Sequence, residues 1–156
     1  MKEIEALDLA IKIASDYHYK QVDKSGQPYI LHPLSVMMKM DTVLEKTVAV
    51  LHDIVEDTEC TLHRLKTFGF SGVVISAIDS ISRREFESVD SYYNRIIINR
   101  IATKVKIADL EHNMAVERLL TIRGKDIKRI RFYHEQWKML NDRLNNHFNV
   151  YGERRW

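Results

Sequence analysis

The sequence has only one cysteine, two prolines and five glycines in 156 residues, and each scarcity narrows the class of protein. A single cysteine, Cys60, excludes an internal disulfide and is typical of a reducing compartment, so we expect a cytoplasmic protein. So few prolines and glycines argue against a β-sandwich or barrel, because those folds need many turns.

The chain also lacks a long apolar run and an excess of charge of one sign. No segment has the length of an apolar membrane span, and acids interrupt the N-terminal region where a signal peptide would be apolar. The 24 basic and 22 acidic residues leave a formal charge of +2, which gives no reason to expect nucleic-acid or membrane binding. We expect one domain over residues 1–150, followed by a frayed tail over 151–156.

Helical periodicity dominates the chain. The expected helices cover 3–18, a segment from Pro33 to about 40, 45–57, 61–68, 71–81, 90–100, 102–120 and 124–148. Pro33 suits the first turn of a helix, Gly69 suits the position just after one, and Ser71 can cap the next. The pattern predicts an all-α bundle of about seven or eight helices. Phe132 and Trp137 look exposed on the last helix, which leaves a homodimer contact open.

Residues 51–57, Leu-His-Asp-Ile-Val-Glu-Asp, hold the most informative pattern in the chain. The pair His52-Asp53 is followed one helical turn later by Glu56-Asp57, so that on one helix His52 lies above Glu56 and Asp53 above Asp57. The apolar segment directly before this motif is suited to burial. Three acids and an imidazole at the end of a buried helix are costly unless something compensates their charge. A divalent metal is the obvious compensation.

Two further clusters carry the same chemistry. His32 stands directly before a helix-starting proline, and the segment Lys106–Asn113 contains another acid. The candidate metal ligands are two imidazoles and two carboxylates, namely His32, His52, Asp53 and Asp109. This mixed nitrogen and oxygen set suits Mn²⁺ or another first-row divalent ion. Glu56 and Asp57 would then be carboxylates able to take a proton from water at the metal.

Each cluster also has an ordinary structural explanation when it is taken alone. A lone histidine such as His32 is more often a turn or helix-end residue, and Asp109 could be only a salt-bridge partner of Lys106. Glu56-Asp57 could be a solvated helix end, although acids near a helix C-terminus oppose its dipole. The combination of three clusters in one short chain favours the metal site.

Other polar residues are interpreted by default as structural or solvated. This applies to His112 among the remaining histidines, and to the basic residues Lys128, Arg129 and Arg131 of the last expected helix.

Three motifs, read in order, resemble the HD-domain phosphohydrolases and, more narrowly, the hydrolase domain of the RelA/SpoT alarmone enzymes and the small alarmone hydrolases. They are His32-Pro33, Leu51-His52-Asp53-Ile54-Val55-Glu56-Asp57-Thr58, and Lys106-Ile107-Ala108-Asp109 with His112-Asn113-Met114. The segment from Lys24 to Pro33 (Lys-Ser-Gly-Gln-Pro-Tyr-Ile-Leu-His-Pro) matches that branch closely. The similarity covers roughly residues 4 to 120.

The resemblance implies an HD-domain helical fold in which His32, His52, Asp53 and Asp109 hold Mn²⁺. It implies that Glu56 and Asp57 position or activate the attacking water, and that Asn113 touches the ribose or phosphate region of a nucleotide. The implied reaction removes pyrophosphate from the 3′ position of ppGpp and returns GDP.

Two positions depart from the family pattern and leave alternatives open. Asp23 stands where alarmone hydrolases usually carry an arginine associated with the guanine base, and Leu110 replaces a second arginine. The basic and aromatic residues that could grip phosphates in their place, with a solvated surface as the other interpretation, are Lys24, Arg83, Arg84, Tyr92 and Arg95. The alternatives are hydrolysis of another nucleoside phosphate by the same centre, or a catalytically silent nucleotide-binding module.

Overall fold

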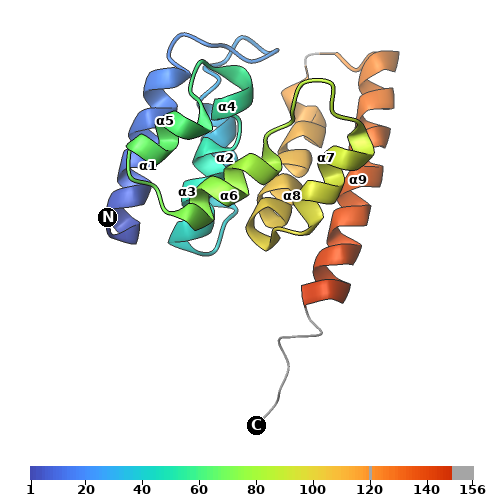
Figure 1. Cartoon of the computed structure of the whole chain (residues 1–156). Coiled ribbons are helices and arrows are strands. Elements are labelled where there is room, and N and C mark those ends of the chain that lie inside the picture. The colour runs from blue at the N-terminus through green and yellow to red at the C-terminus, as the bar shows by residue number, and fades with distance from the viewer. Residues whose placement is uncertain (120, 149–156) are drawn as a thin grey trace.

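The structure, a computed structural model, describes residues 1–119 and 121–148, and helices are the regular structure of this part of the chain (Figure 1). The helices are α1 (Glu3–Tyr17), α2 (Leu31–Met38), α3 (Val43–Leu51), α4 (Ile54–Asp57), α5 (Leu62–Thr67), α6 (Gly72–Ile81), α7 (Val89–Ile97), α8 (Arg100–Met114), the short 3₁₀ helix η1 (Val116–Arg118) and α9 (Gly124–Phe148). One isolated antiparallel bridge joins Val22 and Pro28. The all-α expectation is confirmed.

Two buried helices hold the bundle together. α3 packs against α1, α2, α6 and α8, and its residues Val48 to Leu51 are completely buried. α8 contacts α2, α3, α6, α7 and α9, so it joins the N-terminal helices to the C-terminal ones (Figure 1). Because α8 is central, an acid on its buried face lies among side chains from both halves of the chain.

The helix expected over 45–57 is interrupted. Thr42 begins α3 with its side chain on the Glu45 amide, and the helix ends at Leu51. Asp53 lies at the N-cap position of the separate helix α4, and both the Glu56 and Asp57 amides donate to its carbonyl. The described residues therefore form nine α-helices where the periodicity predicts eight. Two expected helix ends are confirmed, since Gly69 has a φ of +89° and the Ser71 side chain accepts from the Val74 amide.

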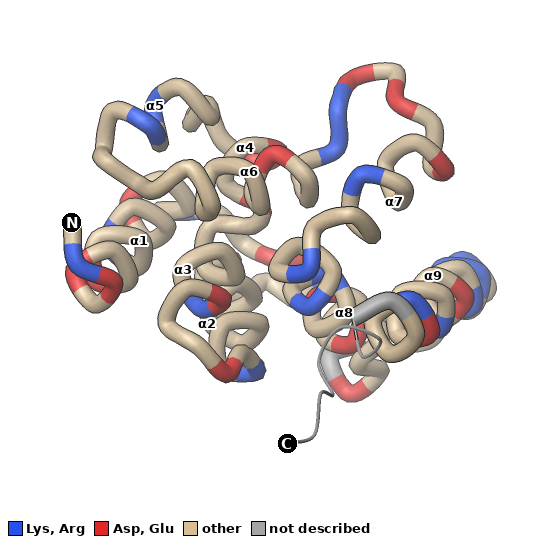
Figure 2. The backbone as a smooth tube through the Cα atoms, turned by 60° about the horizontal axis from the view of Figure 1, so that its bottom comes forward, with Lys and Arg blue, Asp and Glu red and all other residues tan. Residues whose placement is uncertain are grey.

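The last helix docks through one apolar and one polar anchor. Leu140 is completely buried, and the Trp137 Nε1–H donates to Glu111 Oε1 at 3.0 Å. Lys39, directly after α2, binds the other Glu111 oxygen through its Nζ at 2.8 Å, so one carboxylate links the end of α2 with α8 and α9. Acidic and basic positions are interspersed along α9 (Figure 2). Trp137 thus packs within the chain, while the homodimer stays a prediction. The expected tail over 151–156 lies outside the described residues.

None of the described helices combines the length and apolarity that crossing a membrane requires.

Replacing Leu140 with alanine should lower the free energy of unfolding by about 2–5 kcal/mol, because a fully buried leucine leaves a cavity that the bundle only partly closes. Ile127→Ala on the same helix is the matched control, since Ile127 is 54% exposed and the change should stay within about 0.5 kcal/mol. Urea unfolding followed by circular dichroism measures both. Equal stability of the two variants would show that α9 is not anchored at Leu140.

Candidate metal centre

Two helices and the break between two others bring the four predicted ligands together. His32 comes from α2, His52 and Asp53 from the break between α3 and α4, and Asp109 from α8. Candidate donor atoms of His32, His52 and Asp109, all buried, lie within 4.8 Å of one another. Asp109 Oδ1 is 3.1 Å from His32 Nε2 and 3.6 Å from His52 Nε2. Asp53 Oδ2 lies 3.3 Å and 3.1 Å from the same two nitrogens.

The hydrogen bonding of His52 fits a cation at this point. Its Nδ1 is 2.7 Å from the carbonyl oxygen of Ala49, which can only accept, so Nδ1 carries the hydrogen. In the neutral ring, Nε2 then presents a lone pair, and this buried atom has no hydrogen-bond partner. It faces the oxygens of Asp53 and Asp109, an arrangement that needs either a second proton or a metal ion. A carbonyl on the far nitrogen is also how metal-binding histidines are commonly oriented.

The charges of the cluster compensate one another strongly. Burial lowers the pKa of His52, but Asp53 and Asp109 outweigh it and raise that pKa well above its usual range. Burial raises the pKa of Asp109, but Lys106 and the two histidines hold it well below its usual range. Without a metal, a proton on His52 would balance the buried carboxylates, and a divalent ion among the same atoms would serve that purpose with the ring neutral.

Lys106 and Asn113 hold both oxygens of Asp109 from the same helix. Lys106 Nζ is 2.8 Å from Asp109 Oδ2, and Asn113 Nδ2 donates to Asp109 Oδ1 at 2.6 Å. Burial lowers the pKa of Lys106, but Asp109 more than offsets this and raises it well above the usual range. Lys106 therefore stays charged although it is buried, and its ammonium also lies 5.5 Å from the ring centroid of Tyr92.

His112 contacts a predicted ligand, although the sequence alone suggests only a structural or solvated role for it. Its Nδ1 lies 2.7 Å from His32 Nδ1, so one of the two nitrogens donates to the other. This contact leaves His32 Nε2 directed at the acids. The available signal was spacing, because His112 follows Asp109 by three residues on one helix and so shares its face.

Tyr29 is a second site residue that the sequence did not single out. Its hydroxyl lies 2.6 Å from Asp53 Oδ2 and 2.8 Å from Asp57 Oδ2, so it links a predicted ligand to a predicted catalytic acid. Burial and these two carboxylates raise the pKa of Tyr29 far above its usual range, so the phenol keeps its proton. Its position three residues before His32, in the segment that resembles the alarmone hydrolases, was the available signal.

A cavity of about 530 Å³ opens beside the cluster. It is lined by Val22, Asp23, Lys24, Ser25, Tyr29, His32, Asp53, Glu56, Asp57, Lys106, Asp109, Asn113, Ala115, Leu119, Arg129 and Tyr133. The predicted catalytic pair and two of the predicted substrate-binding residues are therefore part of one wall. Glu56 is exposed at this cavity, yet the surrounding protein desolvates its carboxylate enough to raise its pKa.

The last helix contributes two lining residues that sequence reasoning left out. Arg129, interpreted as part of a solvated face, lies in the cavity wall, with its guanidinium 3.3 Å from Asp126. Tyr133 follows it one turn later on the same face of α9. Their spacing on a helix was visible in the sequence, but the docking of α9 over the cavity was not.

Four of the expected phosphate-gripping residues do not line this cavity. Arg84 pairs with Asp79, and Arg95 binds Glu87, both outside the cavity wall. The Tyr92 hydroxyl donates to a main-chain carbonyl, and the Arg83 guanidinium donates to another. All four belong to the connection between α6 and α7 or to α7 itself.

Asp23 has a local structural role at the cavity edge. Its Oδ1 accepts hydrogen bonds from the Ser25 and Gln27 amides, at 2.8 Å and 3.0 Å. Gly26 in this turn has a φ of +78°, a conformation that a glycine adopts without strain. The acid thus stabilises the turn that presents Lys24.

No protein-family model matches the chain. Curated bacterial proteins do. A guanosine-3′,5′-bis(diphosphate) 3′-pyrophosphohydrolase of Borreliella burgdorferi is 28% identical over 127 residues, covering 72% of this chain and 19% of the relative. The bifunctional (p)ppGpp synthase/hydrolase SpoT of Escherichia coli is 30% identical over 129 residues, covering 72% and 18%. A GTP pyrophosphokinase of Streptomyces coelicolor is 32% identical over 155 residues, covering 90% and 18%.

Among solved structures, a metazoan ortholog of SpoT that hydrolyzes ppGpp has a similar fold, with a TM-score of 0.70 and 21% identity over 90% of this chain and 86% of that one. Over most of its length, the chain is similar in sequence to RelA/SpoT enzymes. The resemblance expected from the motifs is thus confirmed. This RelA/SpoT-like chain spans less than a fifth of the length of the curated relatives described above.

Mn²⁺ should stabilise the RelA/SpoT-like chain, because an ion that binds only the folded state adds to the free energy of unfolding. At about 100 times its Kd the gain is about 2.7 kcal/mol, or a rise in Tm of roughly 5–10 °C. His52→Gln should abolish this rise. His63→Gln, an exposed histidine outside the cavity, should leave it unchanged. Differential scanning calorimetry with and without Mn²⁺ measures it, and an equal rise in all three proteins would contradict the site.

Proposed function

We propose that this chain is a metal-dependent hydrolase that removes pyrophosphate from the 3′ position of ppGpp. The observation that carries the proposal is the convergence of His32, His52, Asp53 and Asp109 beside a cavity that also holds Glu56 and Asp57. The names of the similar bacterial hydrolases and of the metazoan SpoT ortholog support ppGpp as the substrate.

The two histidines and two aspartates would hold the divalent ion, and we propose Mn²⁺ because the donor set mixes imidazole nitrogens with carboxylate oxygens. When bound, such an ion supplies positive charge beside the reacting phosphate and makes water more acidic. The chain's own residues orient the donors. Ala49 fixes His52, His112 contacts His32, and Lys106 holds Asp109.

Glu56 and Asp57 would orient the attacking water and accept its proton. Burial raises the pKa of Glu56, which makes its carboxylate a better proton acceptor. Tyr29 restrains Asp57 through its hydroxyl. In the reaction, the water oxygen bonds to the phosphorus attached to the ribose 3′ oxygen, and the bond between that phosphorus and the 3′ oxygen breaks. The 3′ oxygen takes a proton, which gives GDP and pyrophosphate.

Cationic residues on the cavity wall would hold the phosphates of the nucleotide. Lys24, Lys106 and Arg129 line the cavity from three different segments of the chain, and the cavity volume of about 530 Å³ falls within the usual range for a small-molecule site. We propose Lys24 and Arg129 as contacts to phosphate oxygens and Asn113 as a contact to the ribose region. Asn113 would exchange its hydrogen bond with Asp109 for one with the substrate.

Asp23 keeps a second candidate open, namely the hydrolysis of another nucleoside phosphate by the same centre. It lines the cavity where the related enzymes usually carry an arginine associated with guanine. Its side chain is an acid bound to the turn of residues 23–27, so it supplies no cation for stacking on the base.

Mn²⁺-loaded protein should convert ppGpp to GDP and pyrophosphate. Glu56→Gln and Asp57→Asn should each lower kcat by about 10²–10⁴-fold, since each removes a carboxylate that is proposed to handle the proton of water. Glu59→Gln is the matched control, because Glu59 is exposed and does not line the cavity. Chromatography of the products from ppGpp, pppGpp, GTP and ATP measures the outcome.

If the protein cleaves the other nucleotides but not ppGpp, its function is the second candidate, the hydrolysis of another nucleoside phosphate. If no nucleotide is cleaved although the metal is bound, the chain is a silent nucleotide-binding module and the proposed activity is wrong.

A further inference from the structure

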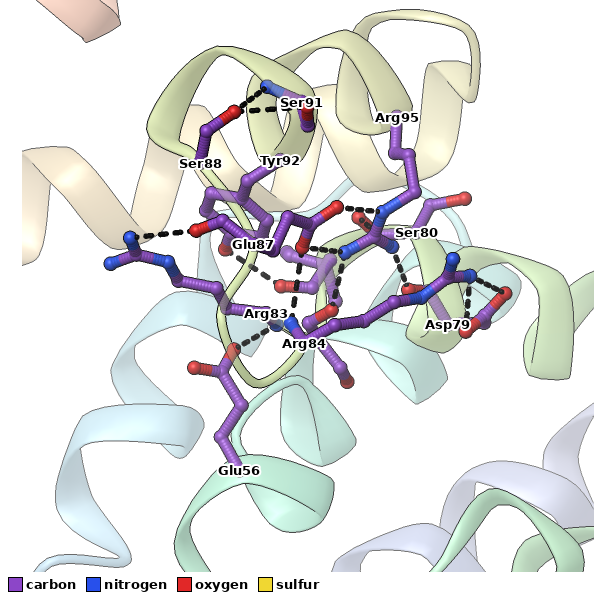
Figure 3. Close-up of polar contacts among 12 residues, drawn as sticks. Glu56, Asp79, Ser80, Arg83, Arg84, Glu87, Ser88, Ser91, Tyr92 and Arg95 are labelled. Atoms are coloured by element: carbon purple, nitrogen blue, oxygen red, sulfur yellow. Dashed lines mark hydrogen bonds and ion pairs between the residues drawn. The ribbon is translucent and has the colours of Figure 1, made fainter.

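The loop between α6 and α7, residues 82–88, reaches across to Glu56. The backbone N–H of Arg83 donates to Glu56 Oε1 at 3.0 Å, so an uncharged main-chain group orients this carboxylate (Figure 3). Among the described residues in the hydrogen bonds of this loop, Glu56 is the one that lies on α4. The position of one backbone amide therefore bears directly on a proposed catalytic side chain.

Arg95 holds the loop at both of its ends. From α7, its Nε and Nη2 donate to the two oxygens of Glu87 at 2.7 Å and 2.6 Å, a bidentate ion pair (Figure 3). Its Nη2 also donates to the Ser82 carbonyl at 2.8 Å, and its Nη1 to the carbonyls of Asp79 and Ser80. Arg95 and Glu87 are only 18% and 9% exposed. One guanidinium thus holds three points together: the end of α6, the residue preceding Arg83 and the far end of the loop.

The loop needs such a restraint because its backbone is unusual. Phe86 has a φ of +59°, in the left-handed region that bulky side chains disfavour, and its side chain is 97% exposed. Phe86 therefore gains no burial that would offset its conformation. The contacts that hold the loop come instead from Glu87, which also accepts from the Arg84 amide at 3.0 Å, and from the Arg83 guanidinium on the Glu87 carbonyl.

We propose that Arg95 is a positioning residue for Glu56, acting through Ser82, Glu87 and the Arg83 amide. The proposal rests on the function given above, in which Glu56 handles the proton of the attacking water. It gives a role to the basic residues of this loop that differs from gripping phosphate. Their side chains fix the loop, and the loop fixes the catalytic carboxylate.

The groups around Glu56 determine in which direction its pKa should change when the loop contact is lost. Lys106 on α8 and the Arg83 amide favour the charged carboxylate, whereas burial and the nearby Asp53 and Asp57 disfavour it. Loss of the amide contact should therefore raise the pKa of Glu56 further. Because the proton acceptor must be ionised, the acid limb of the kcat profile should then move to higher pH.

Arg95→Lys and Arg95→Gln test the proposal in this chain with Mn²⁺ and ppGpp. We expect kcat to fall about tenfold, the order of effect when a hydrogen bond to a charged group is lost, with KM unchanged and the acid limb at higher pH. Asp79→Asn is the matched control, because it breaks the exposed Arg84–Asp79 pair but keeps the Asp79 carbonyl that Arg95 binds. It should change neither kcat nor the limb.

A second readout needs no activity and so separates this proposal from the proposed function. In the wild type, the amide resonance of Arg83 should follow the ionisation of its acceptor, and Glu56→Gln should remove that titration. In the Arg95 variants the titration should shrink and the exchange of the Arg83 amide with solvent should speed up, whichever nucleotide the chain cleaves.

Two results would overturn the positioning role. One is an Arg83 amide that titrates and exchanges as in the wild type after Arg95→Gln. The other is a higher KM with unchanged kcat and pH profile, which would make Arg95 a substrate contact.

Discussion

The structure depends on the compensation of charge around Asp109. This acid is buried on the helix that joins the two halves of the bundle, where an unpaired carboxylate would be very costly. Lys106 and Asn113 hold it from its own helix, and His32 and His52 meet it from two other elements. The same contacts that make the burial tolerable also bring the donors of a metal site together. Burial of Asp109 and convergence of the donors therefore rest on the same contacts.

The sequence predicted the all-α fold and indicated the two histidines and two aspartates that the structure brings together, because both depend on local pattern. Helical periodicity gives the elements, and His52-Asp53 adjacent to a buried segment already implies a compensating group. The break between α3 and α4 was not predictable from periodicity, since the apolar pattern continues through it. It follows from tertiary contacts, because His52 and Asp53 both turn toward side chains of α2 and α8. An uninterrupted helix was expected where the site required a bend.

The basic residues could not be sorted from the sequence. Arg129 and Arg95 look alike as basic residues on expected helices, yet Arg129 lines the cavity while Arg95 is enclosed by carbonyl oxygens and Glu87. What separates them is the packing of α7 and α9 around α8, and that packing depends on contacts between residues distant in sequence. His112 and Tyr29 are different, because their spacing from predicted ligands lay within the motifs themselves. Spacing within a motif could be read, whereas docking between helices could not.

The charge of the cavity wall bears on the order in which ligands bind. The described residues that line it include five acids and three basic residues (two lysines and one arginine). Their formal charge is −2 before any proton on histidine is counted. A pyrophosphate group brings further negative charge into this partly enclosed space, where Coulomb repulsion is stronger than in water. One divalent cation brings the wall to neutrality and leaves Lys24 and Arg129 to attract phosphate. The same ion that is proposed to act on water therefore also makes the cavity acceptable to its substrate, so removal of the metal should weaken nucleotide binding as well as catalysis.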